Sequence, residues 1–479
     1  MTKQLIHKCL ALAIITLIVS GCKAPELLTK EANKEVPAGF YNSLDSTNSA
    51  RLSWRQYFTD PYLTALIDSA LAGNGNQELN IALQEIAISQ NEVLARAGEY
   101  RPFVGLRGGA GVEKAARYTN RGSTEANIDI KPGRESPDPL PDFVVNLYAR
   151  WEVDIWHKLR NAKKAAALRY LSSREGRNFT TTNIVAEIAT SYYELLSLDT
   201  QLTILQNNIE IQNNALRIVR MQKEAAKVTE LAVQRFQAQV LNTQSLQYGI
   251  QQRITETENR INFLLGRYPQ RIARSSDNFE TLVPELVRAG LPTQLLSNRP
   301  DIRQAELELT AAKIDVQVAR ANFYPSLGLS ADLGLRAFNP IYLAKLPESL
   351  LASLIGDLAG PLVNKNSIQA TYYSANARQI QAIYSYERTV LNAYIEVINQ
   401  LSNIGNLQNT YDLKYQEVQA LTQSITISNN LFRSARADYM EVLLTQRDAL
   451  ESRFDLIETK MQQLNATVNV YRALGGGWN

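Results

Sequence analysis

The chain has 479 residues, enough for one large domain or two or three ordinary ones. Lys and Arg number 50 against 47 Asp and Glu, so the formal net charge is only +3. Nucleic-acid-binding proteins usually carry a stronger basic excess, which argues against that class. The few cysteines and histidines (Cys9, Cys22, His7 and His157) make a Ser-His-Asp triad, a Cys-His pair or a His-rich metal site hard to build. We therefore expect neither an enzyme nor a bound cofactor.

The first residues have the pattern of an export signal. Lys3 and Lys8 precede an apolar stretch from Leu10 to Val19, which is too short to span a bilayer. Small residues then lead to Cys22, as in a bacterial lipobox. We predict a signal peptide over residues 1–21 and acylation of Cys22, which would anchor the chain in lipid. The alternative is a plain secretory signal with an incidental cysteine.

The residue after the acylation site indicates the destination membrane. Lipoproteins held in the inner membrane typically carry Asp there, whereas this chain has Lys23, which favours the outer membrane. Residues 22–58 are polar and contain Pro25 and Pro37, and they read as an extended segment. Helical patterns follow from about Asp60 to Leu71 and from Gln77 to about Tyr100.

Two segments alternate between apolar side chains and side chains that are mostly polar or small. In the first, apolar residues occupy every second position from Phe143 to Val153, and in the second from Leu327 to Leu335. Runs of about ten residues with this period fit transmembrane β-strands. With two weaker companions, we predict four strands, at about 102–114, 143–155, 325–336 and 351–362. Strands of a soluble sheet remain the alternative reading.

Two stretches lack proline for an unusual length, from Asp142 to Tyr268 and from Leu362 onward. Apolar residues between Ile184 and Val219 recur in steps of mostly three and four, which implies left-handed coiled-coil packing. We predict long helices at about 160–226, 229–266, 366–430 and 438–474. The first would be roughly 100 Å long. A helical filament or bundle is the competing interpretation of these segments.

Short sequence motifs occur twice. Ala95-Arg96-Ala97 recurs as Ala319-Arg320-Ala321, each before a predicted strand, and Leu264-Leu265-Gly266 resembles Ala473-Leu474-Gly475, each ending a predicted hairpin. We therefore predict two internal repeats, over residues 59–270 and, after an equatorial linker, within 271–479.

The predicted strands require an oligomer. An open sheet would expose unpaired backbone groups to lipid, and single-chain barrels begin at about eight strands. Four strands per chain therefore predict one barrel shared by several copies, continued by a ring of helices as a tube.

Three motifs resemble the TolC-like outer membrane factors, and within them the lipoprotein OprM/NodT branch. They are Trp151–Arg160, the segment Gly290–Pro292 with Asn298–Glu306, and Ala473–Trp478, and Trp54–Leu71 is similar to the first equatorial helix. The resemblance implies an α+β membrane protein, a homotrimer with a 12-stranded outer-membrane β-barrel and a 12-helix periplasmic α-barrel. It also implies two partners, a periplasmic adaptor and an inner-membrane pump, and so an exit duct for small molecules or drugs.

The family is closed at its periplasmic tip by side chains near the last interhelical turn. The resemblance places Asp438 at the tip aspartate, with Glu441, Arg436 and Arg433 beside it as pore or gate residues. The usual turn glycine is Ala435 here and the usual tyrosine is Phe432, so locking through that tyrosine cannot operate. An ordinary solvated turn residue or helix N-cap is the other reading of Asp438. His157 stands where the family motif usually has glycine, and we expect it at the surface near the barrel base.

Two competing functions remain open from the sequence. A type I secretion duct for polypeptides would have a similar interior, although lipidation and the Gly-Gly-Gly-Trp ending favour small-molecule efflux. A structural coiled-coil lipoprotein is the second, and the four alternating strands argue against it.

Overall fold

A computed structural model describes residues 24–40, 45–72, 75–131, 133–276, 279–284, 288–434 and 436–478. The predicted signal peptide and Cys22 lie outside these residues. The chain divides into two compact units. Unit 1 comprises Met1–Glu31, Ala87–Leu171 and Leu307–Tyr384, and unit 2 comprises Ala32–Ile86, Ser172–Glu306 and Ser385–Asn479.

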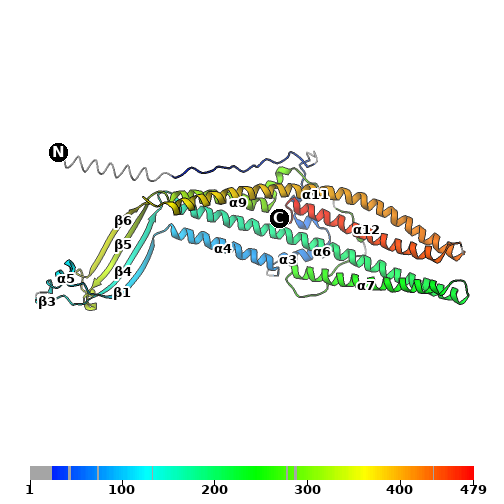
Figure 1. Ribbon diagram of the computed structural model, residues 1–479, viewed down its shortest axis with the longest axis horizontal. Coiled ribbons are helices and arrows are strands. Elements are labelled where there is room, and N and C mark those ends of the chain that lie inside the picture. Colours follow the sequence, from blue (N-terminus) through cyan, green and yellow to red (C-terminus); the bar gives the residue numbers. More distant parts are fainter. Residues whose placement is uncertain are drawn as a thin grey trace. The chain divides into compact units, whose positions relative to one another are not determined.

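The structure combines long helices with one main sheet. The longer helices, labelled in Figure 1, are α3 (Pro61–Leu71), α4 (Gln77–Glu99), α6 (Lys158–Glu224), α7 (Glu230–Leu264), α9 (Pro300–Ala321), α11 (Asn366–Arg433) and α12 (Tyr439–Ala473). Short helices are α2 (Trp54–Tyr57), α5 (Asn120–Glu125), α8 (Leu295–Asn298) and α10 (Pro340–Leu343). The strands are β1 (Phe103–Glu113), β2 (Asp129–Lys131), β3 (Arg134–Glu135), β4 (Leu140–Val153), β5 (Ser326–Ala337) and β6 (Leu350–Ala359). No helix of the described residues is both long and apolar enough to cross a membrane.

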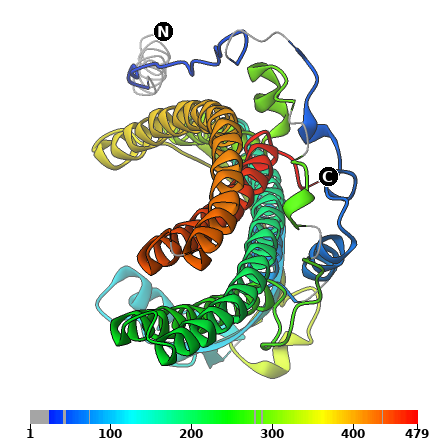
Figure 2. The same cartoon turned by 90° about the vertical axis from the view of Figure 1, so that its right-hand side faces the viewer.

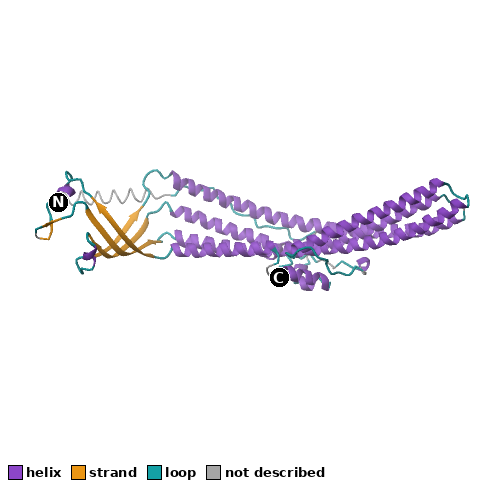
Figure 3. Cartoon of the chain, turned by 90° about the horizontal axis from the view of Figure 1, so that it is seen from below, coloured by secondary structure: helices purple, strands orange, loops and turns teal. Residues whose placement is uncertain are grey.

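Unit 1 is built on a four-stranded antiparallel sheet in the order β1-β4-β5-β6, which Figure 3 shows as a twisted layer. The register aligns side chains of one kind across the strands. One row joins Leu106, Leu147, Leu333 and Ala352, and the adjacent row joins Gly105, Tyr148, Asp332 and Ser353. One face of the sheet is therefore apolar and the other largely polar. At Gly105 a Cβ atom would lie 2.7 Å from Cζ of Tyr148, so glycine makes room for that ring.

Three strand ends differ from the predicted ones by two residues or more: β4 begins three residues early, at Leu140, and two C-terminal ends come early for local reasons. β4 ends at Val153, because the next residue, Asp154, turns away and accepts hydrogen bonds from the backbone N–H groups of Leu159 and Arg160 at the start of α6. β6 ends at Ala359, because Pro361 follows and cannot donate to a strand ladder. His157 has φ 57°, a left-handed conformation that favours the glycine usual at this position.

Unit 2 is held by apolar side chains between long helices. The predicted apolar stripe of α6 faces this core, where Ile188, Tyr192, Leu195 and Leu205 are completely buried. Further along, Val219 of α6, Phe236 of α7 and Leu443 of α12 form one cluster. In Figure 2, α6 and α7 (green) lie side by side, as do α11 and α12 (orange to red).

The C-termini of α7 and α12 end in the same type of helix cap. The N–H of Gly266 donates to the carbonyl of Phe263 and that of Arg267 to Asn262, while Gly475 and Gly476 donate to Arg472 and Tyr471 in the same spacing. This is a Schellman motif, whose left-handed residue is usually glycine, and Gly266 and Gly475 have φ 64° and 88°. The recurring Leu-Gly dipeptide of the sequence marks these two caps.

Candidate functional site

Three features of the described chain can serve a channel: the sheet of unit 1, and the helical turns and buried ion pairs of unit 2. No group of His, Cys, Asp and Glu in the described residues could hold a metal ion.

The apolar face of the sheet is open to its surroundings in the single chain. Leu106 is 72% exposed, Leu147 52%, Leu333 56% and Leu354 80%. A continuous apolar face of this kind on a monomer marks a surface that meets lipid or another chain. Its two edge strands, β1 and β6, each have one side without a partner strand among the described residues.

The opposite face of the sheet carries a hydrogen-bonded polar network. The amide Nδ2 of Asn146 donates to Oδ1 of Asp332 at 2.6 Å, and Arg336 donates two hydrogen bonds of 2.8 Å to the carboxylate of Asp142. Polar groups that pair across strands suit a face that lines water rather than lipid.

The turn between α11 and α12 carries the charged residues singled out in the sequence. Asp438 lies at the N-cap position of α12 without a side-chain capping bond, and Arg433 is the last residue of α11. The N–H of Arg436 donates to the carbonyl of Leu431 at 2.9 Å, and that of Glu441 to Asp438 at 3.2 Å. All four side chains are exposed, and none forms an ion pair within the described residues. Ala435 lies outside those residues.

The turn between α6 and α7 differs in its charges. Lys223 pairs with Glu230 at 2.6 Å across this turn. Hydrogen bonds from Lys223 and then Gln234 hold the pKa of the Glu230 carboxyl below its ordinary value. Ala226 takes the left-handed position with φ 55°. The α6–α7 turn thus pairs Lys223 with Glu230 within the chain, whereas none of the four charged residues at the α11–α12 turn is paired among the described residues.

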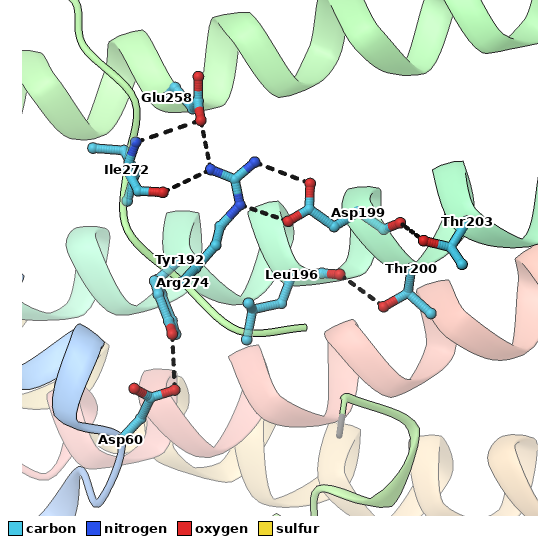
Figure 4. A network of polar contacts seen from close by, with 9 residues as sticks. All are labelled: Asp60, Tyr192, Leu196, Asp199, Thr200, Thr203, Glu258, Ile272 and Arg274. Atoms are coloured by element: carbon cyan, nitrogen blue, oxygen red, sulfur yellow. Dashed lines mark hydrogen bonds and ion pairs between the residues drawn. The ribbon is translucent and has the colours of Figure 1, made fainter. Parts of the chain in front are cut away.

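Sequence reasoning missed the ion-pair cluster of Arg274, Asp199 and Glu258 (Figure 4). Arg274 follows α7 and is only 10% exposed, and its Nη2 donates to Oδ1 of Asp199 on α6 at 2.9 Å. Its Nη1 donates to Glu258 of α7 and, at 2.9 Å, to the carbonyl of Ile272. Burial alone would lower the pKa of Arg274, but the two carboxylates outweigh it and raise the pKa. The cluster therefore fastens the segment after α7 to both helices.

A second buried arginine, Arg299, joins α9 to the last helices. Its guanidinium donates to Asp301, to Glu396 of α11 at 2.8 Å and to the carbonyl of Ala473 at the end of α12 at 2.7 Å. Glu396 also accepts from Arg472. These contacts of Arg299 give the Asn-Arg-Pro-Asp motif a structural role, because they hold the start of α9 against α11 and α12. The motif was visible in the sequence, but its distant partners were not.

Comparison with known proteins supports one family. Residues 67–267 and 291–476 match the family of outer membrane efflux proteins. The chain is 28% identical over 425 residues to the pyoverdine export outer membrane protein OpmQ of Pseudomonas aeruginosa, covering 89% of this chain and 87% of that protein. It is 24% identical over 483 residues to the cation efflux system protein CusC of Escherichia coli O6:H1, covering 99% of each.

Solved structures show the same fold. The open-state outer membrane channel MtrE of Neisseria gonorrhoeae superposes with a TM-score of 0.81 at 21% sequence identity, over 95% of this chain and 98% of that one. The fold class expected from the resemblance, α+β and TolC-like, is thus confirmed. With the family match spanning most of its length, the chain belongs to the outer membrane efflux proteins.

Proposed function

We propose that three copies of the chain form the exit duct of a tripartite efflux pump in the outer membrane. The observation that carries the proposal is the sheet, with an apolar face exposed over all four strands and two open edges. In lipid such edges cost several kcal/mol for each unpaired backbone group. Pairing β1 of one copy with β6 of the next removes every edge, and three copies give a 12-stranded barrel.

The duct is passive in this proposal, and a periplasmic adaptor and an inner-membrane pump supply its substrates and energy. OpmQ is named for pyoverdine export, CusC for cation efflux and SrpC of Pseudomonas putida for solvent efflux. Substrates therefore differ widely between relatives that share one fold, in agreement with selection by the pump. We propose small molecules or ions as the substrate class, rather than polypeptides.

The experiment that tests the duct is the mass of the purified mature protein in detergent, followed by recording in planar bilayers. We expect a particle of three chains that conducts in discrete steps. A monodisperse monomer with its full secondary structure would show that no barrel is shared between copies.

Lipidation of Cys22 is a further part of the proposal, motivated by the Val-Ser-Gly-Cys sequence. A Cys22→Ala variant is expected to lose incorporation of radiolabelled palmitate completely, since the thiol is the acylated atom. The barrel itself spans the membrane in this proposal, so the variant should still form trimers. Label retained on the variant would contradict the assignment.

We also propose that Asp438 lines the closed periplasmic mouth, with Glu441, Arg433 and Arg436 beside it. Its exposure and lack of an ion pair support this role. Three carboxylates within about 8 Å of one another interact appreciably at physiological salt and favour cations.

Asp438→Asn is therefore expected to weaken cation selectivity and block by multivalent cations in single-channel recordings. A matched control is Asp448→Asn on the same helix, whose carboxylate already pairs with Arg447 at 2.9 Å. Equal behaviour of the two variants would place Asp438 outside the pore.

A further inference from the structure

Aromatic residues lie where the main sheet of unit 1 meets its helices. The indole Nε1 of Trp151 donates to the carbonyl of Tyr100 at 3.1 Å, and that of Trp156 donates to Pro325 at 2.7 Å. Trp156 also stacks on Tyr324, with ring centroids 4.6 Å apart. Rings with an apolar body and a bonded polar edge are typical of the boundary between hydrocarbon and headgroups. If the sheet spans the membrane as proposed above, this level is its periplasmic boundary.

Three carboxylates close to this level are already neutralised, whereas Asp357 of β6 is exposed and forms no ion pair among the described residues. Glu99 accepts from Arg96, and Asp154 accepts from Arg160. Glu152, at the end of β4, pairs with Lys158. These carboxylates are therefore not free to neutralise further cations.

Just outside the strands at this level, four cations form no ion pair among the described residues. They are all exposed, and we call them the basic collar: Arg101, Lys163, Lys164 and Arg320. Arg101 precedes β1 by two residues, Arg320 precedes β5 by six, and the lysines lie about 8 Å along α6 from its start. Lysine and arginine stems can extend over such distances toward a headgroup layer.

The opposite end of the sheet has no such excess. There Glu113 accepts hydrogen bonds from Arg121, Asp142 pairs with Arg336, and Lys114 lies 3.7 Å from Asp138. Arg117 and Lys345 at this end form no ion pair among the described residues either, but the exposed carboxylates of Asp129, Glu135 and Glu348 there are unpaired as well. Unpaired cations therefore outnumber unpaired carboxylates only at the end that carries the aromatic rings.

We propose that the basic collar binds the phosphate groups of anionic phospholipids, such as phosphatidylglycerol, in the periplasmic leaflet of the outer membrane. This inference rests on the proposed function, because it needs the sheet to span the membrane. Cations near an anionic lipid surface gain attraction that adds up from residue to residue and weakens with salt. The neighbouring aromatic rings would hold the acyl-chain side of the same lipid.

The test uses the full mature protein in detergent, with phosphatidylglycerol or zwitterionic phosphatidylethanolamine added, and native mass spectrometry of the bound lipid. The variant is Lys163→Gln/Lys164→Gln/Arg320→Gln. The control, Lys114→Gln/Arg117→Gln/Lys345→Gln, removes three cations from the other end of unit 1's sheet. We expect wild type and control to retain phosphatidylglycerol preferentially, and the collar variant to lose roughly fivefold in affinity per cation. Raising the salt concentration should narrow this difference.

Equal retention of phosphatidylglycerol by the collar variant and wild type would overturn the collar proposal, and so would an equal loss in the control. In either case trimers that still conduct would leave the proposed duct standing. A protein that forms no trimer at all would instead contradict the proposed function itself.

Discussion

Arg274→Met is expected to lower the free energy of unfolding by about 3–5 kcal/mol, as is usual when one partner of a buried ion pair is removed. The substitution would leave Asp199 and Glu258 without their shared cation, at side-chain exposures of only 19% and 14%. Methionine fills similar volume, so the loss reports mainly on uncompensated charge. Unfolding followed by circular dichroism in detergent, with chemical denaturant, measures the change.

The control removes the charges together. Arg274→Met/Asp199→Asn/Glu258→Gln replaces the ionic cluster by neutral groups of similar shape, and it should recover much of the lost stability. If the single variant is as stable as wild type, water reaches the two carboxylates and the cluster is no clamp. If the triple variant is no better than the single one, the loss comes from packing rather than charge.

The sheet could be predicted from sequence because its information is local. Alternation from Phe143 to Val153 defines which side chains share a face, and the register in the structure continues that face onto Leu333 and Leu354. The apolar stripe of α6 was equally readable, because burial repeats with the helical period.

The ion-pair clusters of Arg274 and Arg299 could not be predicted, because the residues that form each cluster are far apart along the chain. Asp199 and Arg274 are separated by 75 residues, and Arg299 and Ala473 by 174. Nothing in the local pattern distinguishes Asp199 from a solvated helix residue. Only the packing of the segment after α7 onto α6 and α7 brings the charges together.

The charged turn between α11 and α12 could be predicted only in part. The family resemblance pointed to Asp438, and the single chain shows it exposed and unpaired. Its role as a gate depends on several copies of the chain that are arranged around one axis. The pattern of residues within one sequence does not show how those copies are arranged. The residue could thus be predicted, but its three-fold environment remains a proposal.

Leu354→Arg should have the other large effect, through the apolar face of β6. Leu354 is 80% exposed in the single chain and lies beside Ala331 and the apolar row of the sheet. An arginine on the lipid face of a barrel costs about 2–4 kcal/mol near the bilayer midplane, and a trimer would bear that cost three times. We expect a strong loss of membrane-inserted trimer, measured by native electrophoresis of membrane extracts.

The matched control is Ser353→Arg, one residue earlier on the same strand and on the polar face. Its new guanidinium would lie near the carboxylate of Asp332, whose Oδ2 is 3.4 Å from the Ser353 hydroxyl. A cation there faces water and a carboxylate instead of hydrocarbon, so the trimer should form nearly as in wild type. Because the side chain alternates between faces at every residue, these neighbours carry the same charge into opposite environments. If both variants form as much trimer as wild type, neither face of β6 meets lipid, and the shared barrel would have to be abandoned.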